Sequence, residues 1–306
     1  MDNDCPDRSI SVGAGDDYLV GQFFAMASPC EVLVDCADEA EAEHLTHIVA
    51  TEAWRIEDKF SRYHDGNIVS RINNATGRPV EVDDETAAMI DFAVTLHQLS
   101  DGGFDVTSGV LRRVWRFDGS SHLPTRRAVK DIMKLVGWRR VKWDTPLLTL
   151  PTGMEIDLGG IGKEYAVDRC AGLVKQESSV ACLVNFGGHL ASTAAPRNRK
   201  GWIVGIESAV QQDSASKRVL NLKIGALATS GDARRFLLRD GVRYSHILNP
   251  KTGWPVPDAP RSITVAADTC TQAGMLSTIA MLKGAHAEEF LDAQGVRYWC
   301  YRDPVA

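Results

Sequence analysis

Residues 155–168 read EIDLGGIGKEYAVD, and this stretch decides how we expect the chain to fold. Its apolar start predicts a strand, its three glycines predict a turn, and a helix is expected after Lys163. Glycines at such a junction let backbone N–H groups approach a phosphate, which Lys163 could then contact. A tight turn with a solvated lysine explains the pattern equally well. The spacing of Gly159, Gly160 and Gly162 matches neither a Walker A loop nor a Rossmann fingerprint.

Outward from this stretch, helical and strand patterns follow one another without regular alternation. Apolar residues at helical spacing predict a long amphipathic helix over 39–60. A second helix is expected from Asp84, its N-cap, to a stop at Gly102-Gly103. An α+β architecture therefore fits better than a doubly wound parallel sheet, in one unit over 21–306 behind a polar leader over 1–20. The remaining patterns predict strands at 31–36, 141–143, 147–150, 181–186, 202–207, 219–224 and 262–267, and helices after 124, at 271–282 and at 287–291.

Composition excludes several classes of protein. The 306 residues carry 34 basic and 40 acidic side chains, mixed in sign, so nucleic acid is not expected as a partner. No apolar run approaches the roughly 20 residues of a membrane span, and the N-terminus resembles no secretory signal. We therefore expect a cytoplasmic protein, or a periplasmic one if a leader has been removed. Seven cysteines without a Cys-x-x-Cys pair indicate neither a disulfide framework nor a zinc site.

Two further glycine clusters and several aromatic residues could line a ligand site. Residues 185–189 read NFGGH after an apolar strand, and residues 228–235 read ATSGDARR. The glycines of the first cluster suggest close approach of the backbone to a ligand, with His189 as a polar loop residue. His246 precedes a turn at 249–253 and is the best functional candidate among the eight histidines. Stacking on a heteroaromatic ring or ordinary core packing would each explain three aromatic residues: Tyr63, Phe104 and Trp115.

Six blocks in the same order, from Met26 to about Gly284, resemble the ApbE-type flavin transferases, the FAD:protein FMN transferases. The resemblance covers nearly the whole chain, and no single block carries it alone. The similar segments are Ala25–Cys30, Phe60–Tyr63, Ser100–Gly109, Asp157–Lys163, Gly187–Gly188 and His246–Pro255.

The resemblance implies a T-fold-related α+β unit with mixed or antiparallel sheets and packed helices. It also implies an activity: proteins of this family split FAD and pass its FMN half to a Ser or Thr hydroxyl of a partner flavoprotein, releasing AMP. Lys163 would assist at the pyrophosphate, and His246 is our hypothetical base for the hydroxyl. The residues that would line the FAD site are Met26, Tyr63, Gly103, Phe104, Asp105, Asp157, Lys163, His246 and Ile247.

The family's magnesium site, as the resemblance implies it, is incomplete here. A backbone carbonyl near Gly160 and the hydroxyl of Thr278 would be kept, but Gly274 stands where the family has an aspartate. The position after Gly188, commonly acidic in the family, is His189. Another acid such as Asp268, or water, could complete the metal shell. Two alternative functions also stay open: FAD binding without catalysis, as a carrier or sensor, and hydrolysis of FAD by a pyrophosphatase.

Overall fold

An eight-stranded sheet forms the centre of the computed structural model, which describes residues 8–118, 120–206, 218–232 and 235–302. Its strand order is β1-β2-β3-β7-β8-β11-β14-β15, and every neighbouring pair is antiparallel. The strands are β1 (Ser11–Ala14), β2 (Leu19–Ala25), β3 (Ser28–Val34), β7 (Cys182–Phe186), β8 (His189–Ser192), β11 (Gly225–Gly231), β14 (Ser262–Ala267) and β15 (Arg297–Tyr301).

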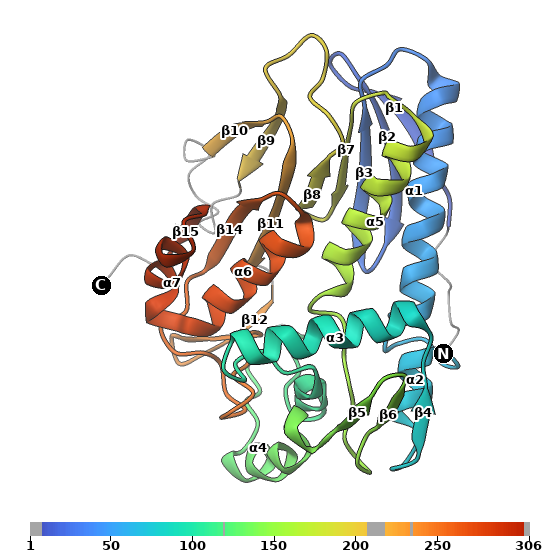
Figure 1. The fold of residues 1–306 in the computed structure, drawn as a ribbon. Coiled ribbons are helices and arrows are strands. Elements are labelled where there is room, and N and C mark those ends of the chain that lie inside the picture. Colours follow the sequence, from blue (N-terminus) through green and yellow to red (C-terminus); the bar gives the residue numbers. More distant parts are fainter. Residues whose placement is uncertain (1–7, 119, 207–217, 233–234, 303–306) are drawn as a thin grey trace.

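Three helices cover one face of this sheet and bury the main core against it (Figure 1). They are α1 (Glu39–Phe60), α5 (Gly162–Glu177) and α6 (Cys270–Lys283), and α7 (Ala287–Gln294) follows α6. Helix α1 approaches β2 most closely at Gly21, where an added Cβ would lie 1.8 Å from Thr46 Oγ1. Only glycine lets the helix pack at this distance. The opposite face carries a smaller core that includes Trp202, under the hairpin of β9 (Trp202–Ile206) and β10 (Arg218–Leu222).

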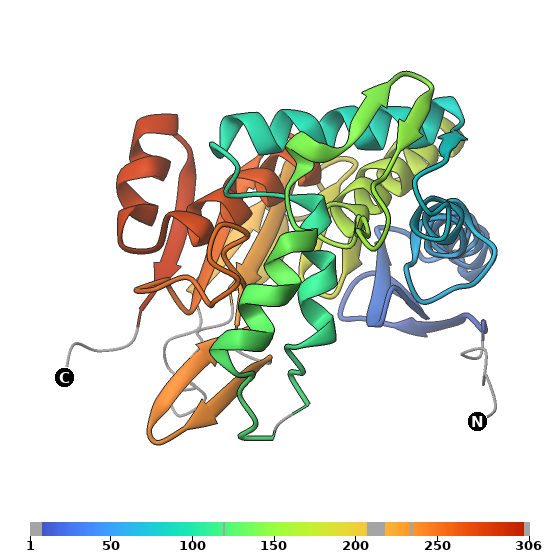
Figure 2. The same ribbon diagram turned by 90° about the horizontal axis from the view of Figure 1, so that it is seen from below.

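A second layer of short elements lies beyond the ends of these helices. Helix α3 (Asp84–Leu99) crosses below α5 in Figure 1, beside the small sheet β4-β6-β5. The hairpin β12-β13 lies beside α4 in Figure 2, and Leu237 and Val129 share a cluster with Trp115. These elements are α2 (Ile68–Asn73), β4 (Pro79–Glu81), η1 (Val106–Arg113), α4 (Arg126–Ile132), η2 (Met133–Leu135), η3 (Trp138–Arg140), β5 (Lys142–Asp144), β6 (Leu147–Thr149), β12 (Phe236–Arg239) and β13 (Val242–Ser245). The short η5 (Gly284–His286) instead links α6 to α7.

The α+β prediction with antiparallel sheets is confirmed. The long helices are found where their periodicity placed them, although Asp83 rather than Asp84 caps α3. Part of the polar stretch predicted as a leader, 1–20, belongs to the sheet, because β1 pairs with β2 as an exposed edge hairpin. No helix in the described ranges is long and apolar enough to cross a membrane. Predictions at Cys5, Glu207, Ala233 and Arg234 fall outside the described residues.

One strand was not predicted and one local prediction is wrong. Residues 228–231, quoted above as part of a cluster, lie in β11, whose small side chains let α6 pack against the strand. Residues 155–158, predicted as a strand, belong to no strand. The side chain of Asn73 instead pairs with the backbone of Ile156, accepting from its N–H at 2.7 Å and donating to its carbonyl at 3.1 Å. An amide side chain therefore takes the place of a neighbouring strand.

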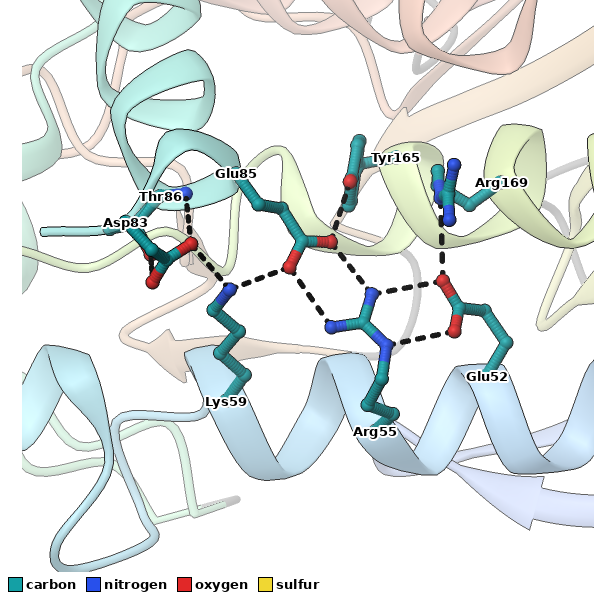
Figure 3. A network of polar contacts seen from close by, with 8 residues as sticks. All are labelled: Glu52, Arg55, Lys59, Asp83, Glu85, Thr86, Tyr165 and Arg169. Atoms are coloured by element: carbon teal, nitrogen blue, oxygen red, sulfur yellow. Dashed lines mark hydrogen bonds and ion pairs between the residues drawn. The ribbon is translucent and has the colours of Figure 1, made fainter.

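A network of charged side chains ties α1 to α3 and α5 (Figure 3). The carboxylate of Glu85 accepts hydrogen bonds from Arg55 at 2.7 and 2.9 Å, from Lys59 at 2.6 Å and from Tyr165 at 2.7 Å. Glu52 binds the other edge of the Arg55 guanidinium. The hydrogen bonds from Arg55, with those from Lys59 and Tyr165, lower the pKa of Glu85 to about 2.

We expect Glu85→Gln to destabilise the fold by about 1–2 kcal/mol at pH 7, because a charged acceptor of four hydrogen bonds is lost from a partly exposed network. The folded pKa of Glu85 is depressed, so its contribution is present above the ordinary value near 4.5 and is lost as pH falls toward about 2. Urea unfolding of both proteins at pH 7 and at pH 2 measures this difference. The exposed Glu81→Gln serves as the control, and a difference that persisted unchanged at pH 2 would contradict the assignment.

Candidate active site

A cleft of about 900 Å³ opens where the ends of α1, α5 and α6 meet the second layer. This volume lies at the upper end of the roughly 300–1,000 Å³ that is usual for ligand pockets. The two-residue turn between β2 and β3, at Met26 and Ala27, closes one side with φ values of 52° and 54°. The N–H of Met26 donates to Glu57 at 2.9 Å, which anchors this turn to α1.

All eleven residues that the sequence predicted for ligand or metal binding line this one cleft. They come from segments that are far apart in the chain, so their convergence is a property of the fold. Their individual roles stay predictions. The eleven are Met26, Tyr63, Gly103, Phe104, Asp105, Asp157, Gly160, Lys163, His246, Ile247 and Thr278.

The cleft has an excess of positive charge. Its lining holds six Arg or Lys residues against three Asp or Glu residues, and sequence reasoning had picked only one of these cations, Lys163, for the site. Arg62 pairs with Asp157, and both Arg112 and Arg113 pair with Glu155. The other three form no ion pair with any residue that the structure describes. They are Arg116, Lys163 and Arg235, and they leave positive charge available to an anionic ligand.

The glycine segment forms the wall of the cleft beside α5. The N–H groups of Ile161 and Gly162 both bond to the carbonyl of Leu158, so the segment is a tight turn, one of its two predicted forms. Helix α5 then begins at Gly162 with no side-chain cap, and the N–H of Gly162 is already used by the turn. The Nζ of Lys163 lies 3.8 Å from the position of a Cβ on Gly187, which places the lysine beside the β7-β8 turn. Phosphate binding by this segment stays a prediction.

His246 also lines the cleft and lies beside Phe117, with 6.2 Å between the ring centroids. Its Nδ1 is 2.9 Å from the carbonyl oxygen of Arg235, and a carbonyl only accepts, so Nδ1 carries the proton. Burial lowers the pKa of His246 below its ordinary value, which keeps the imidazole neutral near pH 7. The lone pair of Nε2 is then free to accept a proton in the cleft.

The aromatic and acidic candidates differ in what they can offer a ligand. The ring of Tyr63 is 73% exposed at the cleft and is suited to stacking, whereas Phe104 is buried. Trp115 is a core residue: it stacks on Phe117 and donates to a backbone carbonyl at 2.8 Å. The carboxylate of Asp105 is already engaged, because it accepts from Thr107 and from the N–H of Trp138. Asp105 therefore organises the loop that carries Phe104.

A carboxylate that sequence reasoning missed lies behind the wall. Glu164 is 7% exposed, and desolvation raises its pKa to about 7. Its Oε1 is 3.4 Å from Nδ1 of His189, whose pKa burial lowers to about 3. His189 was expected in a polar loop, but it begins β8 and is largely buried. In the sequence, Glu164 could have been noticed only because it directly follows Lys163. The tertiary structure is needed to show that its side chain points inward.

The residues available for a divalent ion are oxygen donors. The carbonyl of Gly160 and the hydroxyl of Thr278 both belong to residues that line the cleft, and Ser230 lies 3.0 Å from that hydroxyl. Within the described ranges, no group of three or more His, Cys, Asp and Glu side chains forms a metal cage. Oxygen donors of this kind suit Mg²⁺, which usually keeps several waters and uses one or two carboxylates together with substrate phosphates. The donor set therefore fits Mg²⁺, provided that one carboxylate is present.

Fold and cleft together define an α+β protein with one positively charged cleft, large enough for a nucleotide, between its main sheet layer and a smaller second layer. The chain belongs to the ApbE family, whose sequence model matches residues 26–299. It is 30% identical to the FAD:protein FMN transferase of Vibrio cholerae over 239 residues, which are 75% of this chain and 70% of that protein. It is 26% identical to the enzyme of the same name from Salmonella typhimurium over 275 residues, 85% and 77% of the two chains.

Solved structures agree with this assignment. The ApbE protein of Thermotoga maritima superposes with a TM-score of 0.83 and 30% identity, covering 92% of this chain and 94% of that one. The flavin transferase ApbE of Vibrio cholerae superposes with a TM-score of 0.81 over 95% of this chain and 94% of that one. At 24% identity, this second likeness supports the fold.

Proposed function

We propose that this chain is an FAD:protein FMN transferase. It binds FAD, cleaves the pyrophosphate, attaches FMN through a phosphoester to a Ser or Thr of a partner flavoprotein, and releases AMP. The observation that carries the proposal is the convergence of eleven family-matched residues in one positively charged cleft. The names of the relatives support the same reaction.

In this reaction the acceptor hydroxyl oxygen forms a bond to the phosphorus of the FMN half. The bond from that phosphorus to the bridging oxygen breaks, and AMP leaves with the oxygen. Nε2 of His246 takes the hydroxyl proton, and the ammonium group of Lys163 stabilises the negative charge on the pyrophosphate. Mg²⁺, when bound, supplies further charge neutralisation there, and the carbonyl of Gly160 and the hydroxyl of Thr278 are residues that would hold it.

Incubation of the protein with FAD and Mg²⁺, with and without a flavoprotein domain that carries a flavinylation site, tests the proposal. We expect AMP and a covalently flavinylated acceptor only when the acceptor is present. AMP release that does not require the acceptor would show that the protein is a pyrophosphatase and not a transferase. Tight FAD binding without any AMP release would show that the protein is a carrier or sensor of FAD and not a transferase.

Tyr63→Ala is expected to weaken FAD binding about 5- to 30-fold, because stacking of a base on an aromatic ring contributes about 1–2 kcal/mol. Fluorescence titration of FAD measures the change. Tyr63→Phe keeps the ring and removes the hydroxyl that accepts from Arg62 at 2.7 Å, so it should bind FAD nearly as the wild type does. Equal losses in the two variants would show that the hydroxyl, and not the ring, makes the contact.

A further inference from the structure

The helix position that lacks the expected aspartate lies directly against a carboxylate from a different helix. Gly274 is buried on α6, and a Cβ added to it would lie 2.5 Å from Cγ of Glu164 and 2.8 Å from its Oε1. Real Cβ atoms do not approach other atoms so closely. The side chain of Glu164, which comes from the first turn of α5, therefore occupies the volume that a side chain at position 274 would need.

Glu164 is buried with few partners for its charge, which is stabilised by a hydrogen bond from its own backbone N–H and by the charge of Lys163. Its side chain is 9% exposed, and glutamates are rarely buried to this extent unless they are paired or bind a metal. Among the residues that the structure describes, its one ion-pair contact is His189, at 3.4 Å from Nδ1, which is too long for a good hydrogen bond. That Nδ1 is itself buried and has no hydrogen-bond partner. The buried imidazole nitrogen thus faces the carboxylate without a good hydrogen bond between them.

The other oxygen donors lie close to Glu164 in the fold. Thr278 follows Gly274 by four residues on α6, so the two positions share one face of that helix, a turn apart. Gly160 precedes Glu164 by four residues in the turn that leads into α5. Both Gly160 and Thr278 line the cleft, and so does Lys163 beside Glu164. A carboxylate, a hydroxyl and a carbonyl make an oxygen donor set of the kind that Mg²⁺ takes.

We propose that Glu164 is the carboxylate ligand of the Mg²⁺ site in this chain, supplied from α5 in place of an aspartate at position 274 on α6. His189 is a positioning residue beside that carboxylate. The inference rests on the proposed function for the identity of the ion and for its purpose at the FAD pyrophosphate. It is an alternative to the sequence-based suggestion that Asp268 replaces the missing acid, because Asp268, exposed directly after β14, is not among the residues that line the cleft.

The decisive measurement is metal binding itself, followed with Mn²⁺ as a spectroscopic probe of the Mg²⁺ site by the electron paramagnetic resonance of the free ion. Glu164→Gln keeps the shape of the side chain and removes its charge. We expect the Kd for Mn²⁺ to rise at least about tenfold. Asp268→Asn is the matched control and should leave the Kd unchanged. An unchanged Kd in a folded Glu164→Gln variant would overturn the inference.

Moving the carboxylate back to α6 gives a second, independent test. Gly274→Asp alone should lower the melting temperature by several degrees, because the new side chain collides with Glu164. The double variant Glu164→Ala with Gly274→Asp removes the collision and should restore Mn²⁺ affinity to within about threefold of the wild type. If Glu164→Gln fails to fold, this double variant decides the question: recovered affinity supports the inference, and absent affinity overturns it.

The outcome separates this inference from the proposed function. Loss of Mn²⁺ binding in Glu164→Gln supports the ligand assignment even if the wild type transfers no FMN. If the wild type transfers FMN but its Mn²⁺ affinity does not depend on Glu164, the proposed function stands and the assignment of Glu164 as a metal ligand is wrong. In that case Glu164 fills the space beside Gly274 without binding the ion.

Discussion

His246→Ala is expected to slow FMN transfer about 10²- to 10⁴-fold and to leave the affinity for FAD within about threefold. General base catalysis by a positioned side chain contributes about this much. The hydrogen bond from Nδ1 to the carbonyl of Arg235 fixes the tautomer whose Nε2 can accept a proton. Single-turnover AMP release with saturating acceptor measures the rate. His47→Ala, an exposed substitution on α1, is the control and should leave the rate unchanged.

The dependence of the rate on pH gives this assignment a second readout. A base must be neutral, so the wild-type rate should fall as pH decreases through the pKa of His246. Burial lowers that pKa from 6.5, so the fall should begin below pH 6.5 and the rate should be flat above it, until another group titrates. The acid limb should be missing from the profile of His246→Ala. A variant with full rate, or with the same acid limb, would assign the base to another residue.

Lys163→Met is expected to lower the transfer rate about 10²- to 10³-fold, the usual cost of removing one donor that stabilises developing charge. The ammonium group lines the cleft, forms no ion pair within the described residues, and lies beside the β7-β8 turn. Methionine keeps most of the length and apolar stem of the side chain while removing its charge. The AMP-release assay measures the rate, and equilibrium titration measures FAD affinity.

The same helix offers a matched control for this substitution. Lys175 lies exposed in the last turn of α5, so Lys175→Met removes an equal charge away from the cleft. It should change the rate less than twofold. If both lysine variants lost activity equally, the effect would come from the overall charge of the protein, and Lys163 would have no particular role at the pyrophosphate.

Helices with strong local signals could be predicted closely from the sequence. The limits of α1 follow from its periodic apolar residues, and those of α3 from the aspartates at its start and the glycines after its end. Neither signal depends on residues that are distant in the sequence. Strands with weak local signals were missed. In β11 the residues are small because α6 packs against them, and this reason lies outside the strand.

The sequence by itself determined the α+β class, and its resemblance to the ApbE family picked out eleven of the residues that line the cleft, because both depend on local patterns that one chain displays. Only the tertiary structure decided what compensates for Gly274. Glu164 is far from Gly274 in sequence, and the packing of α5 against α6 turns its carboxylate inward. Burial and contact across two helices depend on the whole fold, so no local pattern carries that information.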